Sequence, residues 1–285
     1  MPELVVPVLT PFAGGGIDVA ALAAHCRWVV QEGAAGVMLF GTTGEGPSIS
    51  VPEKLAAASE LVDLLPGVPV IASVTETALP TALECVRGYG ELPLRAVLVL
   101  PPYYFREGAA DGVTAFLDQV AAASAHPVLG YHIPSLAPPV PAEWVAGSTL
   151  WGAKDSGGDL AYTRALVAAG KTVYVGAEAV IADAVAAGAA GAIAGMANLL
   201  PGPLARLVAA AGDGDLATAY ALRDEVLAVQ RAVLAAAPEL EFITAFKDLA
   251  GQLHGHPMGD ARLPLRRRRD YLTPSVTAAL AVPAR

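Results

Sequence analysis

The sequence predicts an α/β protein, a closed (β/α)8 TIM barrel followed by a C-terminal helical extension. Three observations lead to this fold class. Short apolar segments alternate with Ala-rich helical segments, and the alternation repeats eight times. The length of 285 residues suits a barrel of about 250 residues with an extension. The connections are short and no Gly-x-Gly-x-x-Gly follows the first strand, so a doubly wound open sheet is the less favoured alternative.

Each of the eight predicted strands is short and almost continuously apolar, as strands buried in a parallel sheet are. The predicted strands cover residues 4–9, 36–40, 69–74, 96–100, 128–133, 150–154, 172–175 and 191–194.

The segments between these strands show helical patterns, and two of them carry start signals. Ser50 and Glu53 have the spacing of a capping box, and Asp159 follows two glycines as a candidate N-cap. The predicted helices cover residues 19–31, 52–65, 81–89, 113–124, 160–169 and 181–187.

After the eighth strand only helical patterns remain, over residues 204–211, 216–237, 242–254 and 275–281, with Pro238 dividing the second from the third. These helices are too many for one barrel unit. We therefore predict a barrel over residues 1–214 and a C-terminal helical domain over residues 215–285.

The composition excludes several classes of protein. Hydrophobic residues make up 54% and charged residues 16%, which indicates a large core rather than disorder. No apolar run reaches about 18 residues and Met-Pro-Glu-Leu is not a signal peptide, so we expect a cytoplasmic protein without a membrane partner. The net charge of −9 disfavours nucleic acid, and the one basic cluster, residues 266–269, is typical of a solvated loop or a subunit contact.

The two cysteines, Cys26 and Cys85, are isolated and have no Cys/His spacing. This pattern argues against a disulfide framework and against a structural zinc site. Both thiols are expected in helix cores.

Lys154 ends the sixth predicted strand, in Leu-Trp-Gly-Ala-Lys-Asp-Ser-Gly-Gly-Asp. Catalytic side chains of barrels lie at the carboxyl ends of strands, and burial beside apolar neighbours such as Trp151 would favour the nucleophilic, uncharged amine. A surface lysine is the alternative. The other lysines are less suitably placed, because Lys54 opens a helix, Lys171 lies in a turn on the other face and Lys247 is in the extension.

Other strand ends carry further polar groups. Gly41-Thr42-Thr43-Gly44-Glu45-Gly46 follows the second strand and could form either an anion cradle or only a tight turn. Pro-Pro-Tyr-Tyr104 follows the fourth strand, and Tyr131-His-Ile-Pro ends the fifth. Each tyrosine could equally be a core residue with a satisfied hydroxyl.

Together these motifs, Gly-Thr-Thr-Gly-Glu, Pro-Tyr-Tyr, Tyr-His-Ile-Pro and Gly-Ala-Lys-Asp-Ser, stand in order at four strand ends. In this the chain resembles the dihydrodipicolinate synthase/N-acetylneuraminate lyase superfamily of pyruvate-dependent class I aldolases. The resemblance begins at Pro-Val-Leu-Thr-Pro-Phe12 and extends through the C-terminal helices. It implies a (β/α)8 barrel with a C-terminal helical domain, usually assembled as a homotetramer; the sequence itself is compatible with a homo-oligomer that is either a dimer or a tetramer.

The resemblance also implies catalytic roles. Lys154 matches the lysine that forms a Schiff base with a small-molecule 2-oxo acid, and Tyr131 matches the phenol beside it. Thr42 matches the hydroxyl of the proton relay. Tyr104 matches a residue that family members insert into the site of the neighbouring subunit. No cofactor or metal is implied, because the covalent lysine imine itself acts as the electron sink.

Four further positions match substrate-binding residues of the family. Thr43 matches the donor to the pyruvate carboxylate, and Gly176 and Ile193 match positions around the 2-oxo acid. Glu178 falls where the lyase branch places an acidic residue against substrate hydroxyls.

One departure bears on the second substrate. Dihydrodipicolinate synthases place a carboxylate-binding arginine five residues after the tyrosine, where this chain has Leu136; Arg106 is the nearest substitute in sequence. The Gly-Pro-Ser run at 46–48 resembles 2-keto-3-deoxygluconate aldolases, and residues 152–159 resemble 4-hydroxy-2-oxoglutarate aldolases. We predict cleavage of a 2-keto-3-deoxy sugar acid or 4-hydroxy-2-oxo acid to pyruvate and an aldehyde. The alternatives are the synthase reaction and, remotely, a non-catalytic barrel that binds a small acid.

Overall fold

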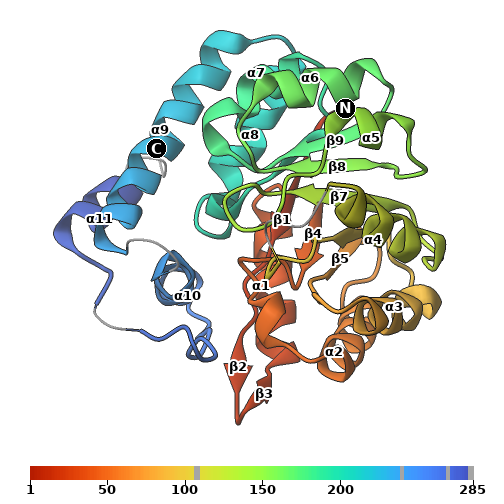
Figure 1. Ribbon diagram of the computed structural model, residues 1–285. Coiled ribbons are helices and arrows are strands. Elements are labelled where there is room, and N and C mark those ends of the chain that lie inside the picture. The colour runs from red at the N-terminus through yellow and green to blue at the C-terminus, as the bar shows by residue number, and fades with distance from the viewer. Residues whose placement is uncertain (106–109, 238–240, 268–269, 282–285) are drawn as a thin grey trace.

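The computed structural model, which describes residues 1–105, 110–237, 241–267 and 270–281, shows a closed barrel of eight parallel strands (Figure 1). The order around the barrel is β1-β10-β9-β8-β7-β6-β5-β4. The TIM barrel is confirmed, and the doubly wound alternative is wrong. All eight predicted strands are present, with ends that shift by at most two residues: β1 (Glu3–Pro7), β4 (Gly36–Leu39), β5 (Val70–Val74), β6 (Ala96–Val99), β7 (Val128–His132), β8 (Gly152–Asp155), β9 (Thr172–Val175) and β10 (Gly191–Ile193).

Helices surround the barrel, and the two predicted start signals are confirmed. The Ser50 N–H donates to Glu53 Oε2 at 3.1 Å, and Asp159 accepts from the Ala161 N–H at 2.9 Å. The barrel helices are α1 (Val19–Gln31), α2 (Val51–Leu64), α3 (Leu79–Gly88), α4 (Ala110–Ala122), α5 (Ala142–Gly147), α6 (Leu160–Ala168), α7 (Ile181–Ala186) and α8 (Pro201–Gly212). Short 3-10 turns are η1 (Gly46–Ser48), η2 (Tyr89–Glu91), η3 (Glu178–Val180) and η4 (Gly195–Asn198).

The core has two parts, since successive strand residues point to opposite faces of the sheet. On β7, Tyr131 belongs to the cluster inside the barrel, whereas His132 points outward and stacks on Tyr162 of α6 with ring centroids 4.1 Å apart. The larger part of the core fills the space between strands and helices and contains both cysteines, Cys26 and Cys85, as buried free thiols.

The C-terminal helices are α9 (Leu216–Ala236), α10 (Glu241–His254) and α11 (Pro274–Leu280). In Figure 1 they lie to one side of the barrel, where α9 packs against α7 and α8 and α11 packs against α9. Asp215 caps α9 by accepting from the Thr218 N–H at 3.1 Å. The division of the chain at 214/215 stays a prediction, and Pro238 lies outside the described residues.

A short hairpin of β2 (Phe12–Ala13) and β3 (Gly16–Ile17) projects below the barrel in Figure 1. Within the part of the chain that the structure describes, no helix combines the length and apolarity that crossing a membrane requires.

Candidate active site

Lys154 and Tyr131 lie side by side inside the carboxyl-terminal mouth of the barrel. They are register neighbours on β8 and β7, and Lys154 Nζ donates to Tyr131 Oη at 3.1 Å. Both side chains are 4% exposed. The structure therefore brings together a buried amine and a buried phenol, as the sequence predicts.

The residues after Lys154 fix its position. Asp155 is fully buried on the other side of β8, where it accepts from the Gly157 N–H and from Thr163 Oγ1, both at 2.8 Å. The Gly176 N–H at the end of β9 donates to the Asp155 carbonyl at 2.6 Å. The backbone that carries the lysine is thus held by both its own loop and the neighbouring strand.

The charged and polar groups around the Tyr131 phenol lower its pKa. Burial acts to raise the pKa of Tyr131, but the adjacent Lys154 charge and hydrogen bonds from Lys154, Thr42 and Ser156 hold this pKa below its ordinary value. A phenol with a lowered pKa exchanges a proton more readily near neutral pH, as general acid–base catalysis requires.

Gly176 leaves the space that the lysine occupies. A Cβ at this position would lie 2.2 Å from Ser156 Oγ and 3.3 Å from Lys154 Cε. No larger residue fits there without displacing the Ser156 side chain. Gly176 therefore lies in the pocket, as predicted, directly beside the lysine side chain.

The turn after β4 forms the opposite wall. Glu45 adopts a left-handed conformation with φ of 56°, and a Cβ at Gly46 would meet the Phe40 carbonyl oxygen within van der Waals overlap. This tight turn presents Thr42 and Thr43 to the cavity. The Thr10 hydroxyl donates to the Gly44 carbonyl at 2.6 Å and fixes the turn to the loop after β1.

A buried ion pair ties the same turn to the C-terminal extension. Lys247 of α10 donates from Nζ to Glu45 Oε1 at 2.9 Å, and the Arg262 N–H donates to Glu45 Oε2 at 2.8 Å. Lys247 and Glu45 are each at most 2% exposed. Lys247 thus supports the turn from behind and does not enter the cavity.

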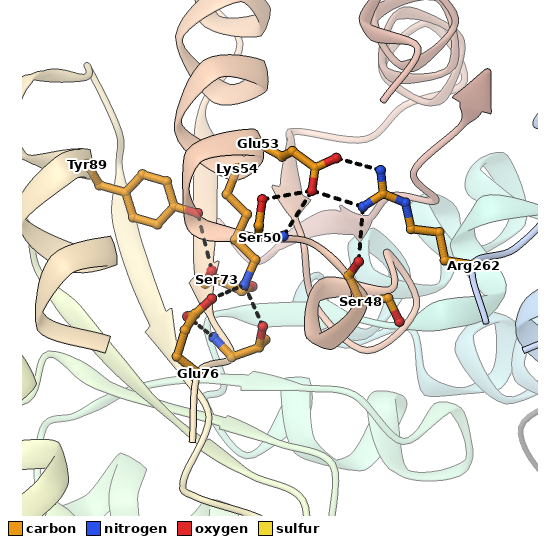
Figure 2. A network of polar contacts seen from close by, with 9 residues as sticks. Ser48, Ser50, Glu53, Lys54, Ser73, Glu76, Tyr89 and Arg262 are labelled. Carbon is orange, nitrogen blue, oxygen red and sulfur yellow. Dashed lines mark hydrogen bonds and ion pairs between the residues drawn. The ribbon is translucent and has the colours of Figure 1, made fainter. Parts of the chain in front are cut away.

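The other two lysines have structural partners. Lys54 is fully buried, with Nζ 2.5 Å from Glu76 Oε1 and 2.6 Å from Thr75 Oγ1, as Figure 2 shows in part. The same figure shows Arg262 bound to Glu53, which holds the extension against α2. Lys171 donates to the carbonyls of Ser148 and Leu150 before β8, at the other end of the barrel. Lys154 is the one lysine that lines the cavity among the described residues.

A cavity of about 520 Å³ opens above Lys154, between the barrel mouth and helices α9 and α10. Seven of the eight predicted site residues line it: Thr42, Thr43, Tyr131, Lys154, Gly176, Glu178 and Ile193. Tyr104 does not; it is 79% exposed and packs edge-on against Phe105. Its predicted role in a neighbouring subunit stays a prediction.

Sequence reasoning missed several residues that line the cavity. Ser156 follows Lys154 directly and could have been found from that position, whereas Gln230, Leu234, Phe242 and Phe246 come from α9 and α10 and carry no motif. Arg106 lies outside the described residues, as do Arg268 and Arg269 of the basic cluster.

One predicted neighbour of the lysine is wrong. Trp151 precedes β8 and lines a depression at the opposite end of the barrel, where Arg95 lies over its ring at 5.8 Å. The rise along a strand places residues three positions apart about 10 Å from each other. Lys154 is instead enclosed by Tyr131 and the residues around Gly176.

Glu178 in η3 is an acidic side chain that lines the cavity. Its Oε1 accepts from the Met196 N–H at 3.1 Å, and its Oε2 accepts from Gln230 Nε2 at 2.8 Å. Burial raises the pKa of Glu178 above its ordinary value, against the lowering by these hydrogen bonds and the Lys154 charge. No group of three or more His, Cys, Asp or Glu side chains suited to a metal occurs in the described ranges.

Comparisons with known proteins agree with this geometry. The model of the Dihydrodipicolinate synthetase family matches residues 1–281. A 4-hydroxy-tetrahydrodipicolinate synthase of Thermomicrobium roseum is 31% identical over 269 residues, which cover 91% of this chain and 87% of that protein.

Two solved structures show the same fold. KD(P)GA from T. tenax superimposes with a TM-score of 0.88 at 26% identity and covers 99% of both chains. A catalytic lysine mutant of Ruminococcus gnavus sialic acid aldolase gives a TM-score of 0.91 at 19% identity, over 99% of this chain and 95% of that one, and supports the fold alone.

Proposed function

The chain belongs to the dihydrodipicolinate synthetase family of carbon–carbon lyases, and from that premise we propose that it forms a Schiff base between Lys154 and a 2-oxo acid. The observation that carries the proposal is the contact between the buried Lys154 amine and the Tyr131 phenol, in a cavity that the Thr42-Thr43 turn also lines.

The first step is imine formation. The neutral Lys154 amine attacks C2 of the 2-oxo acid. The carbinolamine hydroxyl then takes a proton from the Tyr131 phenol and leaves as water, which gives a protonated imine and a Tyr131 phenolate. Thr43, 8% exposed in the turn after β4, lines the cavity and is the donor that we propose for the substrate carboxylate. Fixed donors of this kind hold the imine plane against the proton-transferring group.

The second step breaks the C3–C4 bond. Tyr131 as phenolate accepts the proton of the C4 hydroxyl, the C3–C4 electron pair moves into the imine to form an enamine, and the aldehyde leaves. Protonation of C3 and addition of water then release pyruvate and return the amine. Thr42 and Ser156, which hydrogen-bond to Tyr131, form the relay for the proton.

We propose a 2-keto-3-deoxy sugar acid or another 4-hydroxy-2-oxo acid as the substrate. Leu136 lines the cavity at the position where a synthase would need an arginine, and a leucine cannot donate to the carboxylate of aspartate semialdehyde. The similarity to a named synthase keeps condensation of pyruvate with aspartate semialdehyde as the second candidate.

The proposal extends to assembly, location and cofactors. The exposed Tyr104 and Phe105 side chains suit a contact with a second copy of the chain, in a dimer or a tetramer. We propose a cytoplasmic enzyme that needs no cofactor, because the imine nitrogen accepts the electron pair.

Borohydride reduction in the presence of pyruvate tests the chemistry. We expect a stable adduct of one reduced pyruvyl group on Lys154, found by peptide mass spectrometry, and none in Lys154→Ala. An unmodified Lys154 would refute the proposal. Pyruvate binding that survives Lys154→Ala would instead support a non-catalytic barrel that binds small acids.

A further inference from the structure

Apart from Lys154, no cationic side chain of the described residues lines the cavity. Among the described residues that line the cavity, Lys154 and Glu178 are the only charged side chains. In the proposed reaction the Lys154 nitrogen becomes the imine and cannot serve a second anion. The remaining charged group, Glu178, would repel an anionic substituent.

One side of the outer cavity, the part beyond the catalytic pair, is mostly apolar. Ile133 and Leu136 follow β7, Leu234 comes from α9, and Phe242 and Phe246 come from α10. Phe242 and Phe246 pack with ring centroids 5.4 Å apart, and Leu234 remains 41% exposed at the rim. This wall offers dispersion contacts to a carbon chain, but no hydrogen bonds from its side chains to a phosphate or a carboxylate.

The other side carries Glu178 and Gln230, and the hydroxyl of Ser135, in the segment after β7, is an uncharged polar group on the first side. Both Glu178 oxygens already accept one hydrogen bond, from the Met196 N–H and from Gln230 Nε2, so the carboxyl is held in one orientation. A carboxylate has about four acceptor positions, and those left free can accept from substrate hydroxyls. The Glu178 side is therefore complementary to neutral donors and unfavourable for anions.

We propose that this outer cavity selects an uncharged aldehyde portion, whose carbon chain packs on the apolar wall; the contact of a substrate hydroxyl with Glu178 is what the family resemblance already implies. The inference rests on the proposed aldolase function and narrows its substrates to neutral 4-hydroxy-2-oxo acids. It excludes acids whose chain ends in a phosphate or in a second carboxylate.

A panel of four acids, followed by pyruvate release, tests this selectivity. Two are neutral beyond C4, 2-keto-3-deoxygluconate and 4-hydroxy-2-oxohexanoate, and two are anionic, 2-keto-3-deoxy-6-phosphogluconate and 4-hydroxy-2-oxoglutarate. Glu178 repels an anionic substituent and no cation of the described lining pairs with it, so kcat/KM for the better neutral acid should exceed that for either anionic acid by at least about 30-fold, which corresponds to about 2 kcal/mol. A smaller ratio overturns the proposal, and this would be the result if Arg106 or another cation reached the cavity.

Adding a cation to the apolar wall should reverse the selection. Leu136→Arg should raise the kcat/KM ratio of phosphorylated to unphosphorylated acid at least about tenfold, whereas Leu136→Gln, polar but uncharged, should not. If Leu136→Arg does not fold, Leu234→Arg at the exposed rim makes the same test. An unchanged ratio in a folded arginine variant would count against the wall as the determinant of selectivity.

The Lys154 adduct distinguishes a failure of the proposed aldolase function from a failure of the proposed charge selectivity. If borohydride and pyruvate leave Lys154 unmodified, the aldolase function itself fails. If the adduct forms but anionic acids are cleaved as well as neutral ones, only the charge selectivity fails.

Discussion

Removing the Lys247 ammonium should loosen both the fold and the Thr42-Thr43 turn, which we propose binds the substrate carboxylate. In Lys247→Met the side chain keeps its apolar stem, but Glu45 loses its 2.9 Å partner while it stays buried. The Arg262 N–H, 2.8 Å from Glu45 Oε2, remains as a donor. The Asp260 carbonyl also loses the Lys247 hydrogen bond.

The expected loss of unfolding free energy in Lys247→Met follows from the burial of the Glu45–Lys247 pair. Removing one member of a buried ion pair typically destabilises by about 3–5 kcal/mol, and the remaining Arg262 donor places this case near about 3 kcal/mol. At about 2.1 cal/mol/K per residue, 285 residues have an unfolding entropy of about 0.6 kcal/mol/K, so Tm should fall by roughly 5 °C. Because Glu45 is two residues from Thr43, KM for the 2-oxo acid should rise about 2- to 10-fold, the value of one hydrogen bond.

Calorimetry and steady-state kinetics of Lys247→Met, Glu45→Gln and the double variant measure both effects. The two changes should be less than additive, because each removes the same pair. Arg223→Met is the matched control, since its pair with Asp224 is exposed and contributes at most about 1 kcal/mol. A Tm loss in Lys247→Met no larger than in Arg223→Met, or strict additivity with Glu45→Gln, would refute the reasoning.

Three further predictions follow from the same structure. Tyr131→Phe removes the proton acceptor but keeps the ring, so turnover should fall by roughly 10²–10⁴ while borohydride still traps pyruvate on Lys154; near-normal turnover would reject the role of Tyr131. Burial lowers the pKa of His25 to about 4 from 6.5, and that of the adjacent His254 to about 4 as well, so the unfolded chain takes up both protons at a higher pH than the folded protein. The free energy of unfolding should therefore drop as the pH falls from 6.5 to 4, by about 3 kcal/mol for the buried His25 alone. His25→Asn should flatten that part of the stability profile, and an unchanged slope would contradict the assignment. If Tyr104 completes a neighbouring subunit's site, activity should fall with molecular mass on dilution, and a fully active monomer would disprove it.

The alternation of apolar strands and helical segments was enough to predict the barrel. Each strand and most helices can be predicted from the order of polar and apolar residues within their own short segment. Closure of eight parallel strands then brings all their carboxyl ends to one face of the barrel. For that reason Thr42, Tyr131 and Lys154, far apart in sequence, could be placed at one face of the barrel before any distance was known, whereas the family resemblance implied that Gly176 joins them. The six-residue helix α5 and the two-residue strands of the β2–β3 hairpin were too short to show a period.

Contacts between distant elements required the tertiary structure. The pairs Glu178–Gln230 and Glu45–Lys247 join residues 52 and 202 positions apart, and no local pattern specifies which face of α9 or α10 meets the barrel. Sequence placed Lys154 correctly but misplaced Trp151, because one strand spans the barrel and its two ends meet different surroundings. The sequence by itself therefore determined the fold, through local periodicity, and the position of Lys154 and Tyr131 at neighbouring strand ends, through strand direction. The part of the cavity wall that α9 and α10 supply was decided only by how the extension packs on the barrel, because side-chain burial there depends on surfaces that the chain brings together after the elements have formed.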